Sequence, residues 1–216
     1  MTKPIIKTVF WDLDGTLIDS EHLHADAAFI AFERLNIPLI THEITPGIEN
    51  KLAFAELTGL DLRNDLNHRL FEKWDRLVVD LVLEEININD AIHQSLELFT
   101  HFNSLGITQT VVSNSYLRLV KHSLQQLGII HQVHQIHARD MVTHGKPSPE
   151  LYNNALRGQM NQQANCLAFE DSNTGIKAAQ SAGIVVVGIG KANRNILELD
   201  PQQDSWLNTL NQYYQF

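Results

Sequence analysis

Two aspartates that follow a short apolar run are the first residues in the chain that could do chemistry. Asp12 and Asp14 stand two residues apart, and Gly15 follows them as a residue suited to a tight turn. Two carboxylates at this spacing could share a hard divalent cation, while one of them attacks an electrophile or moves a proton. A single Asp-x-Asp-Gly segment also fits an ordinary Asx turn or a calcium-like loop, so other groups must decide between these interpretations.

Three further sets of polar residues could complete such a site. Ser113 and Asn114 offer a hydroxyl and an amide at an expected helix start, where they could cradle an anion or simply cap the helix. Lys146 lies on an expected loop before a helix, where its ammonium group could neutralise a phosphoryl oxygen or remain solvated. Glu170 and Asp171 supply the oxygen ligands that Mg²⁺ prefers, or a plain acidic cluster at a helix amino terminus.

The elements that would position these groups are short apolar runs that alternate with helical patterns. Continuous apolar runs of this kind are typical of strands in a parallel sheet that is covered on both faces. The runs are residues 5–11, 107–112, 166–169 and 184–189, and the helical patterns are residues 91–105, 116–127, 148–158 and 172–182. The alternation predicts an α/β fold with a Rossmann-like parallel sheet as its core. Residues from Pro201 onward are expected to form a last helix that docks on this sheet.

The stretch from about residue 20 to residue 88 breaks this alternation. Its apolar residues recur at helical spacing, as in Leu66, Leu70 and Trp74, and it contains no convincing strand. We therefore expect an all-helical cap domain of about four helices, inserted after the first strand. The expected domains are a core of residues 1–18 and 89–216 and a cap of residues 19–88.

Four short motifs should meet at one edge of the sheet, because ligands of an open parallel sheet bind at the carboxyl ends of its strands. The motifs are DLDGTL, SN at residues 113–114, GKPSPE and EDSNTG. In this order they resemble the four motifs of the haloacid dehalogenase-like hydrolases, which are mostly phosphatases. The resemblance covers residues 5–20 and 90–190, and the layout of the insertion resembles the helical-cap subgroup that contains β-phosphoglucomutase and many sugar-phosphate phosphatases.

The resemblance implies a role for each catalytic residue. Asp12 would be the nucleophile that forms an aspartyl phosphate, and Asp14 would be the general acid/base that protonates the leaving alcohol and then activates water. Ser113 would bind the transferring phosphoryl group with nearby backbone amides. Lys146 would bridge the nucleophile and a phosphoryl oxygen, and its charge would offset the repulsion between phosphate and carboxylate.

The resemblance also implies a metal cofactor, Mg²⁺, and a set of substrate contacts. Asp12, the main-chain carbonyl of Asp14, Glu170 and Asp171 would hold the ion. The residues expected to bind substrate are Thr16, Asn114, His24 and Lys51. For His24 the alternative is an ordinary histidine on the surface of a helix.

The expected function is a Mg²⁺-dependent phosphatase that hydrolyses a small phosphorylated metabolite, such as a sugar phosphate. Asp14 favours a phosphate ester, because family members that act on other bonds do not need to protonate an alkoxide and lack this aspartate. The alternative is a phosphomutase like β-phosphoglucomutase, whose relatives carry an arginine shortly after the glycine that is Gly47 here. This chain has no arginine between Arg34 and Arg63, and Lys51 is the nearby cation that could replace it. A non-enzymatic phospho-receiver module fits less well, since such modules are about half this length and carry no cap.

Composition limits the partners and the compartment. The formal net charge of −9 argues against a general affinity for nucleic acid or an anionic membrane. No apolar stretch approaches the roughly 18 residues that span a bilayer. Cys166 is the single cysteine of the 216 residues, and the amino-terminal residues lack a signal-peptide pattern, so we expect a cytoplasmic monomer or weak dimer. The spacing of His131, His134 and His137 points these side chains to different faces and does not favour a metal site.

Overall fold

The protein is described by a computed structural model that covers residues 3–43, 50–157, 163–190, 196–200 and 205–216. The chain divides into two compact units. One unit combines Met1–Asp19 with Asn87–Phe216, and the other is Ser20–Ile86. The first unit is called the sheet unit below and the second the helical unit.

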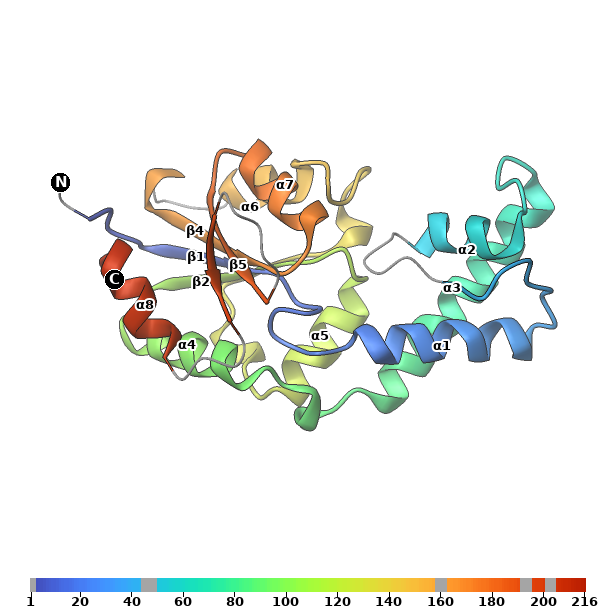
Figure 1. The fold of residues 1–216 in the computed structure, drawn as a ribbon, viewed down its shortest axis with the longest axis horizontal. Coiled ribbons are helices and arrows are strands. Elements are labelled where there is room, and N and C mark those ends of the chain that lie inside the picture. The colour runs from blue at the N-terminus through green and yellow to red at the C-terminus, as the bar shows by residue number, and fades with distance from the viewer. Residues whose placement is uncertain (1–2, 44–49, 158–162, 191–195, 201–204) are drawn as a thin grey trace. The chain divides into compact units, whose positions relative to one another are not determined.

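The sheet unit is built on a parallel sheet that, among the described residues, has six strands (Figure 1). Their order across the sheet is β3-β2-β1-β4-β5-β6, so β1 lies at the centre of the sheet between β2 and β4. The strands are β1 (Thr8–Trp11), β2 (Thr108–Val112), β3 (Gln135–His137), β4 (Cys166–Glu170), β5 (Val185–Ile189) and β6 (Leu197–Leu199). The predicted α/β fold with a Rossmann-like sheet and a helical insertion is confirmed.

Helices cover both faces of this sheet (Figure 1). On one face, α6 (Glu150–Arg157) and α7 (Asn173–Ser181) contribute Tyr152 and Ile176 to a buried cluster that also contains Phe10 and Ala168. On the other face, Trp11 stacks on Phe169 with 4.4 Å between ring centroids. The other α-helices in the described part of this unit are α4 (His93–Ser104), α5 (Leu117–Gln126) and α8 (Trp206–Tyr213). Alternate residues of β1 therefore face opposite layers, which makes the strand buried throughout.

The strands β3 and β6 were not expected from the sequence. They occupy the two edges of the sheet and contain three residues each. Their sequences, Gln-Ile-His and Leu-Glu-Leu, mix polar and apolar residues because an edge strand is only partly covered. Neither segment contains two adjacent apolar residues, whereas each of the four inner strands does.

The helical unit contains, within its described residues, α1 (Glu21–Arg34), α2 (Asn50–Thr58) and α3 (Asp65–Glu85). About four helices were expected, and residues 44–49 lie outside the described part of the chain. An aromatic core holds the unit together. The ring centroid of Trp74 lies 4.8 Å from that of Phe32, which stacks on it, and 5.3 Å from that of Phe54. The Trp74 indole also donates a hydrogen bond to the Ala28 carbonyl at 3.1 Å. None of the helices in the described part of the chain combines the length and the hydropathy that a membrane span requires.

Candidate active site at the carboxyl ends of the strands

A buried lysine joins two carboxylates that come from different strands. The Lys146 ammonium donates hydrogen bonds to Asp12 Oδ1 and to Glu170 Oε1, both at 2.6 Å. Asp12 directly follows β1, and Glu170 is the last residue of β4, which pairs with β1 in parallel. The parallel register therefore places the two acidic residues side by side, and Lys146 reaches them from the loop before α6.

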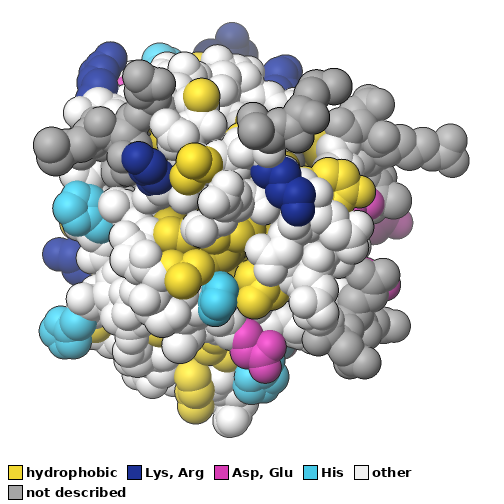
Figure 2. All heavy atoms as spheres, turned by 90° about the vertical axis from the view of Figure 1, so that its left-hand side faces the viewer, with side chains coloured by type: hydrophobic (Ala, Val, Ile, Leu, Met, Phe, Trp, Pro, Cys, Tyr) yellow, Lys and Arg dark blue, Asp and Glu magenta, His cyan; other side chains and the backbone are white. Residues whose placement is uncertain are grey.

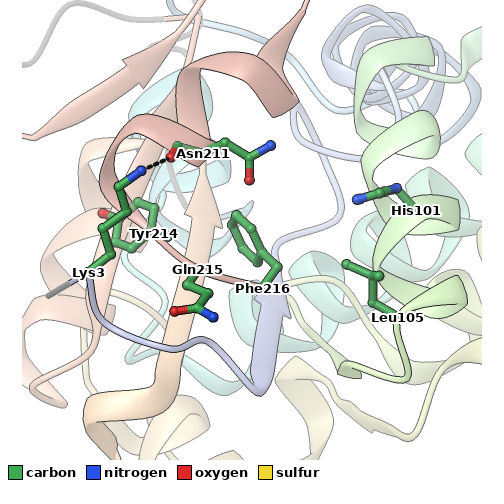
Figure 3. Close-up of a pocket in the computed structure, with 7 residues that line it drawn as sticks. All are labelled: Lys3, His101, Leu105, Asn211, Tyr214, Gln215 and Phe216. Carbon is green, nitrogen blue, oxygen red and sulfur yellow. Dashed lines mark hydrogen bonds between the residues drawn. The ribbon is translucent and has the colours of Figure 1, made fainter.

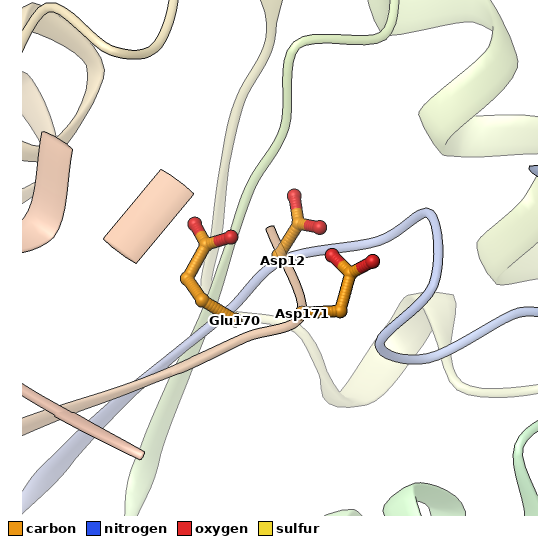
Figure 4. Close-up of side chains that lie close together, drawn as sticks. All are labelled: Asp12, Glu170 and Asp171. Atoms are coloured by element: carbon orange, nitrogen blue, oxygen red, sulfur yellow. The ribbon is translucent and has the colours of Figure 1, made fainter. Parts of the chain in front are cut away.

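Asp171 adds a third carboxylate to this cluster. One oxygen each from Asp12, Glu170 and Asp171 lies within 4.8 Å of the others, and Figure 4 shows the three side chains reaching toward one shared space. A second oxygen of Glu170, Oε2, is buried without a hydrogen-bond partner among the described residues. Three carboxylates face one ammonium group, so the cluster retains negative charge. The unpartnered Glu170 Oε2 and the excess negative charge fit a divalent cation such as Mg²⁺, which prefers hard oxygen donors.

Burial and mutual repulsion shift the pKa values of these groups. Burial, together with the neighbouring Asp12, raises the pKa of Glu170 to about 8 against the opposing influence of Lys146. Burial likewise raises the pKa of Asp12, which Lys146 lowers and Asp14 raises. For Lys146, burial alone would lower the pKa, but Asp12 and Glu170 together hold it above the ordinary lysine value. The lysine therefore remains protonated at any working pH.

Two glycines allow the acidic groups to approach the backbone. Gly175 in α7 lies so close to the Glu170 carboxylate that a Cβ at this position would overlap with Glu170 Oε2. Gly15 has a φ of +77°, in the left-handed region, and a Cβ there would overlap with the Asp171 carboxylate. The glycines of the DLDGTL and EDSNTG motifs are thus required by the packing of the acidic cluster itself.

The loop after β2 holds the backbone of Lys146 in place through hydrogen bonds. The Asn114 amide donates to the Lys146 carbonyl at 3.1 Å, and its oxygen accepts from the Lys146 backbone N–H at 2.8 Å. Ser113 is buried, and its hydroxyl accepts from the Ser115 N–H at 2.9 Å. Asn114 therefore positions Lys146 in this structure, while the substrate contacts expected of Ser113 and Asn114 remain predictions.

The first motif contributes two further residues to the neighbourhood. Asp14 Oδ2 accepts a hydrogen bond from the Ser115 hydroxyl at 2.6 Å. Thr16 is fully buried, and its hydroxyl oxygen has no hydrogen-bond partner in the described part of the chain. Its expected contact with substrate remains a prediction, because this conformation gives the hydroxyl no access to solvent.

Other candidates from the sequence lie outside the acidic cluster. His24 is a partly exposed residue of α1, and Lys51 is an exposed residue of α2, so both belong to the helical unit. Gly47, which entered the mutase comparison, lies outside the described residues. Within those residues, the cluster of Asp12, Glu170 and Asp171 is the one group of three or more ligating side chains that could hold a metal ion, and it includes no histidine.

Sequence reasoning missed two residues that contact the site. The Tyr152 hydroxyl donates to Glu170 Oε1, and burial raises the pKa of this tyrosine well above its ordinary value, so the phenol stays protonated. Ser115 contacts Asp14, as described above. Tyr152 looks like an ordinary core residue of an amphipathic helix, and nothing in its sequence position signals the contact. Ser115 directly follows the expected SN pair, which is the signal that could have found it.

A separate hollow lies on the opposite side of the sheet unit, beside the amino ends of the strands. Hydrophobic side chains gather on this face around a histidine (Figure 2). The hollow has a volume of about 480 Å³, and the Lys3 ammonium at its edge donates to the Asn211 carbonyl at 2.5 Å (Figure 3). Its lining residues are Lys3, His101, Leu105, Asn211, Tyr214, Gln215 and Phe216. The acidic cluster lies at the other end of the strands, where ligands of parallel sheets bind.

Known proteins resemble this chain over nearly its whole length. A validoxylamine A 7′-phosphate phosphatase from Streptomyces hygroscopicus is 27% identical over 186 residues, which cover 85% of each protein. A β-phosphoglucomutase from Bacillus subtilis is 28% identical over 203 residues, which cover 86% of this chain and 84% of that protein. The solved structure of a β-phosphoglucomutase from Clostridium difficile shares the fold with a TM-score of 0.75 and 22% identity, over 97% of both chains.

A family model supplies the assignment. The model described as haloacid dehalogenase-like hydrolase matches residues 9–189, which include all four motifs and the acidic cluster. The match begins in β1 and ends with β5, so it also spans the helical unit. The chain therefore belongs to the family of haloacid dehalogenase-like hydrolases.

Proposed function

We propose that this protein is a Mg²⁺-dependent phosphatase that hydrolyses a small phosphorylated metabolite through an aspartyl phosphate on Asp12. The observation that carries the proposal is the buried cluster in which Lys146 bridges Asp12 and Glu170 beside Asp171. The relatives support it, because one is named as a phosphatase of a phosphorylated small molecule. The geometry supports a nucleophile, a fixed positive charge and metal ligands within one site.

In the first step, a carboxylate oxygen of Asp12 attacks phosphorus. The bond between phosphorus and the leaving oxygen breaks, and Asp14 gives its proton to that oxygen. Phosphoryl transfer depends mainly on positioning and charge stabilisation. Lys146, already 2.6 Å from Asp12, reduces the repulsion between the carboxylate and the anionic phosphate. Ser113 and nearby backbone amides hold the phosphoryl oxygens.

In the second step, Asp14 takes a proton from a water molecule whose oxygen attacks the phosphorus of the aspartyl phosphate. The bond from phosphorus to the Asp12 oxygen breaks, inorganic phosphate leaves, and Asp12 returns as a carboxylate. The same carboxyl group thus acts as a general acid in the first step and as a general base in the second.

Asp12, Glu170, Asp171 and the main-chain carbonyl of Asp14 would hold Mg²⁺. The ion would supply positive charge that stabilises the transferring phosphoryl group. Lys146 and Tyr152 both donate hydrogen bonds to Glu170 Oε1, so the orientation of the Glu170 carboxylate is set before any ion binds.

We further propose that the helical unit acts as a cap that selects a small substrate and excludes bulk water, with His24 and Lys51 as its candidate contacts. The negative charge of the chain disfavours a polyanionic macromolecule as substrate. A small phosphorylated sugar or a similar monophosphate fits this description.

The metal ligands can be tested by Asp171→Asn. This variant should raise the Mg²⁺ concentration for half-maximal rate by at least about tenfold, because even indirect partners of metal ligands contribute ten- to a hundredfold to affinity. The measurement is the rate of p-nitrophenyl phosphate hydrolysis against Mg²⁺ concentration, and EDTA should abolish the wild-type rate. Glu97→Gln, an exposed carboxylate on α4, is the matched control and should leave the metal requirement unchanged. An unchanged requirement in Asp171→Asn would remove this residue from the metal site.

The β-phosphoglucomutase relative makes a phosphomutase the second candidate function. With β-glucose 1-phosphate and a trace of glucose 1,6-bisphosphate, we expect free phosphate as the main phosphorus product, because no arginine lies between Arg34 and Arg63 to hold a second phosphate group. Both free phosphate and glucose 6-phosphate should be followed. Efficient formation of glucose 6-phosphate with little free phosphate would favour the mutase and would assign the missing charge to Lys51 or another residue of the helical unit.

A further inference from the structure

A hydrogen bond between Ser115 and Asp14 connects two loops of the sheet unit, and the proposed catalytic steps do not use it. The Ser115 hydroxyl donates to Asp14 Oδ2 at 2.6 Å, across a sequence separation of 101 residues. The bond is partly buried, and it connects the loop after β1 with the loop after β2. It therefore links the expected general acid/base directly to the segment that begins with Ser113.

Ser115 is itself held firmly by its backbone. Its N–H donates to the Ser113 hydroxyl at 2.9 Å, and its carbonyl accepts from the Arg139 N–H at 3.0 Å. The helix that follows is also anchored, because the Leu117 N–H donates to Asp140 Oδ1 at 2.9 Å. The hydroxyl that reaches Asp14 thus projects from a backbone fixed on both sides.

We propose that Ser115 is a positioning residue that fixes the orientation of the Asp14 carboxyl group for proton transfer. This inference rests on the proposed function. A carboxyl group rotates within a broad well about its Cβ–Cγ bond, so a donor on one oxygen sets the direction of the other. Proton transfer requires the heavy atoms to approach within hydrogen-bond distance, and small misplacements cost a large part of the rate.

Two other roles for Ser115 give different kinetic signatures. A purely structural serine would, when removed, slow the enzyme by the same factor for every substrate. A serine that binds the substrate directly would mainly raise KM. A residue that orients the general acid should matter only where the leaving group needs a proton, because a nitrophenolate departs without one.

The test compares kcat/KM for two probes, glycerol 2-phosphate, whose alkoxide must be protonated, and p-nitrophenyl phosphate. Ser115→Ala should lower kcat/KM for glycerol 2-phosphate by about 10- to 100-fold, which is part of the usual contribution of general acid catalysis. The same variant should change p-nitrophenyl phosphate hydrolysis by less than about threefold, since the acid contributes little there. Ser115→Thr retains the hydroxyl and should restore the lost rate. Ser115→Cys keeps the size of serine with a weak donor and should behave like Ser115→Ala.

Two reference variants separate this inference from the function on which it rests. Asp14→Asn should show the same preference for p-nitrophenyl phosphate, but more strongly. Ser123→Ala, which removes a hydroxyl that donates to the Leu119 carbonyl within α5, should change neither rate. Equal losses on both probes in the Ser115 variants, or no loss on either, would overturn the positioning role while wild-type turnover still supports the phosphatase. Absence of wild-type turnover on both probes with Mg²⁺ would overturn the proposed function and this inference with it.

Discussion

Replacing Asp12 with asparagine should abolish turnover while the protein stays folded. The amide is nearly isosteric with the carboxylate but cannot attack phosphorus, so we expect kcat to fall by about 10⁴-fold or more, as it does when other nucleophiles are removed. Lys146 keeps its second partner, Glu170, at 2.6 Å, so the buried ammonium group is not left without a carboxylate. The loss should be measured with p-nitrophenyl phosphate at saturating Mg²⁺.

The covalent intermediate gives a second measurement. Acid quenching of wild-type enzyme during turnover of a ³²P-labelled phosphate ester should leave label on the protein, and Asp12→Asn should carry none. The circular dichroism spectrum and the thermal transition should confirm that the variant is folded. Glu97→Gln removes an exposed carboxylate from α4 and should retain both turnover and labelling. A labelled Asp12→Asn protein, or one that turns over within about tenfold of wild type, would end the aspartyl-phosphate mechanism on Asp12.

The inner part of the fold could be predicted because its strands are buried on both faces. The cores of β1, β4 and β5 read as continuous apolar runs, whereas β2 is apolar only at Val111 and Val112, and each strand is followed by polar residues or glycine. The edge strands gave no such signal. In β3, Ile136 stands between a glutamine and a histidine, and in β6 Glu198 stands between two leucines. Three residues with mixed polarity cannot be separated from a loop by periodicity alone.

The proximity of the acidic residues followed from topology, since the carboxyl ends of parallel strands meet at one edge. The details did not follow. The sequence could not show that Lys146 contacts both Asp12 and Glu170. That contact depends on the hydrogen bonds by which Asn114 holds the backbone of Lys146. Nor could it show that the Tyr152 hydroxyl contacts Glu170, because Tyr152 lies on the apolar face of a helix and the sequence does not show which polar group it will meet. Such contacts depend on tertiary packing.

Lys146→Met should impair both chemistry and stability, because the same ammonium group performs two tasks. Loss of a fixed charge beside the transferring phosphoryl group should lower kcat by about 10²- to 10³-fold, the cost of removing one preorganised electrostatic partner. Without Lys146, the buried Asp12 and Glu170 lose the cation that both contact, so they cannot both stay ionised without repelling each other. In metal-free protein this should lower the free energy of unfolding by about 3 to 5 kcal/mol, the usual cost of breaking a buried ion pair.

The stability loss should depend on pH with a defined sign. Burial and the neighbouring Asp12 already raise the pKa of Glu170 to about 8, and removal of Lys146 takes away an influence that lowers it. A carboxyl group whose pKa is higher in the folded than in the unfolded protein favours folding while it is protonated, and this contribution is lost as pH rises through the folded pKa. The free energy of unfolding of metal-free Lys146→Met, measured by urea denaturation, should therefore go on declining above about pH 8, where wild type has already lost the contribution of Glu170. Lys177→Met, which replaces an exposed lysine of α7, is the control and should follow the wild-type curve.

Added Mg²⁺ should recover part of the lost stability, because it would supply positive charge to the same carboxylates. Parallel pH curves for Lys146→Met and wild type, with turnover retained, would show that the lysine does not hold this cluster of charges together.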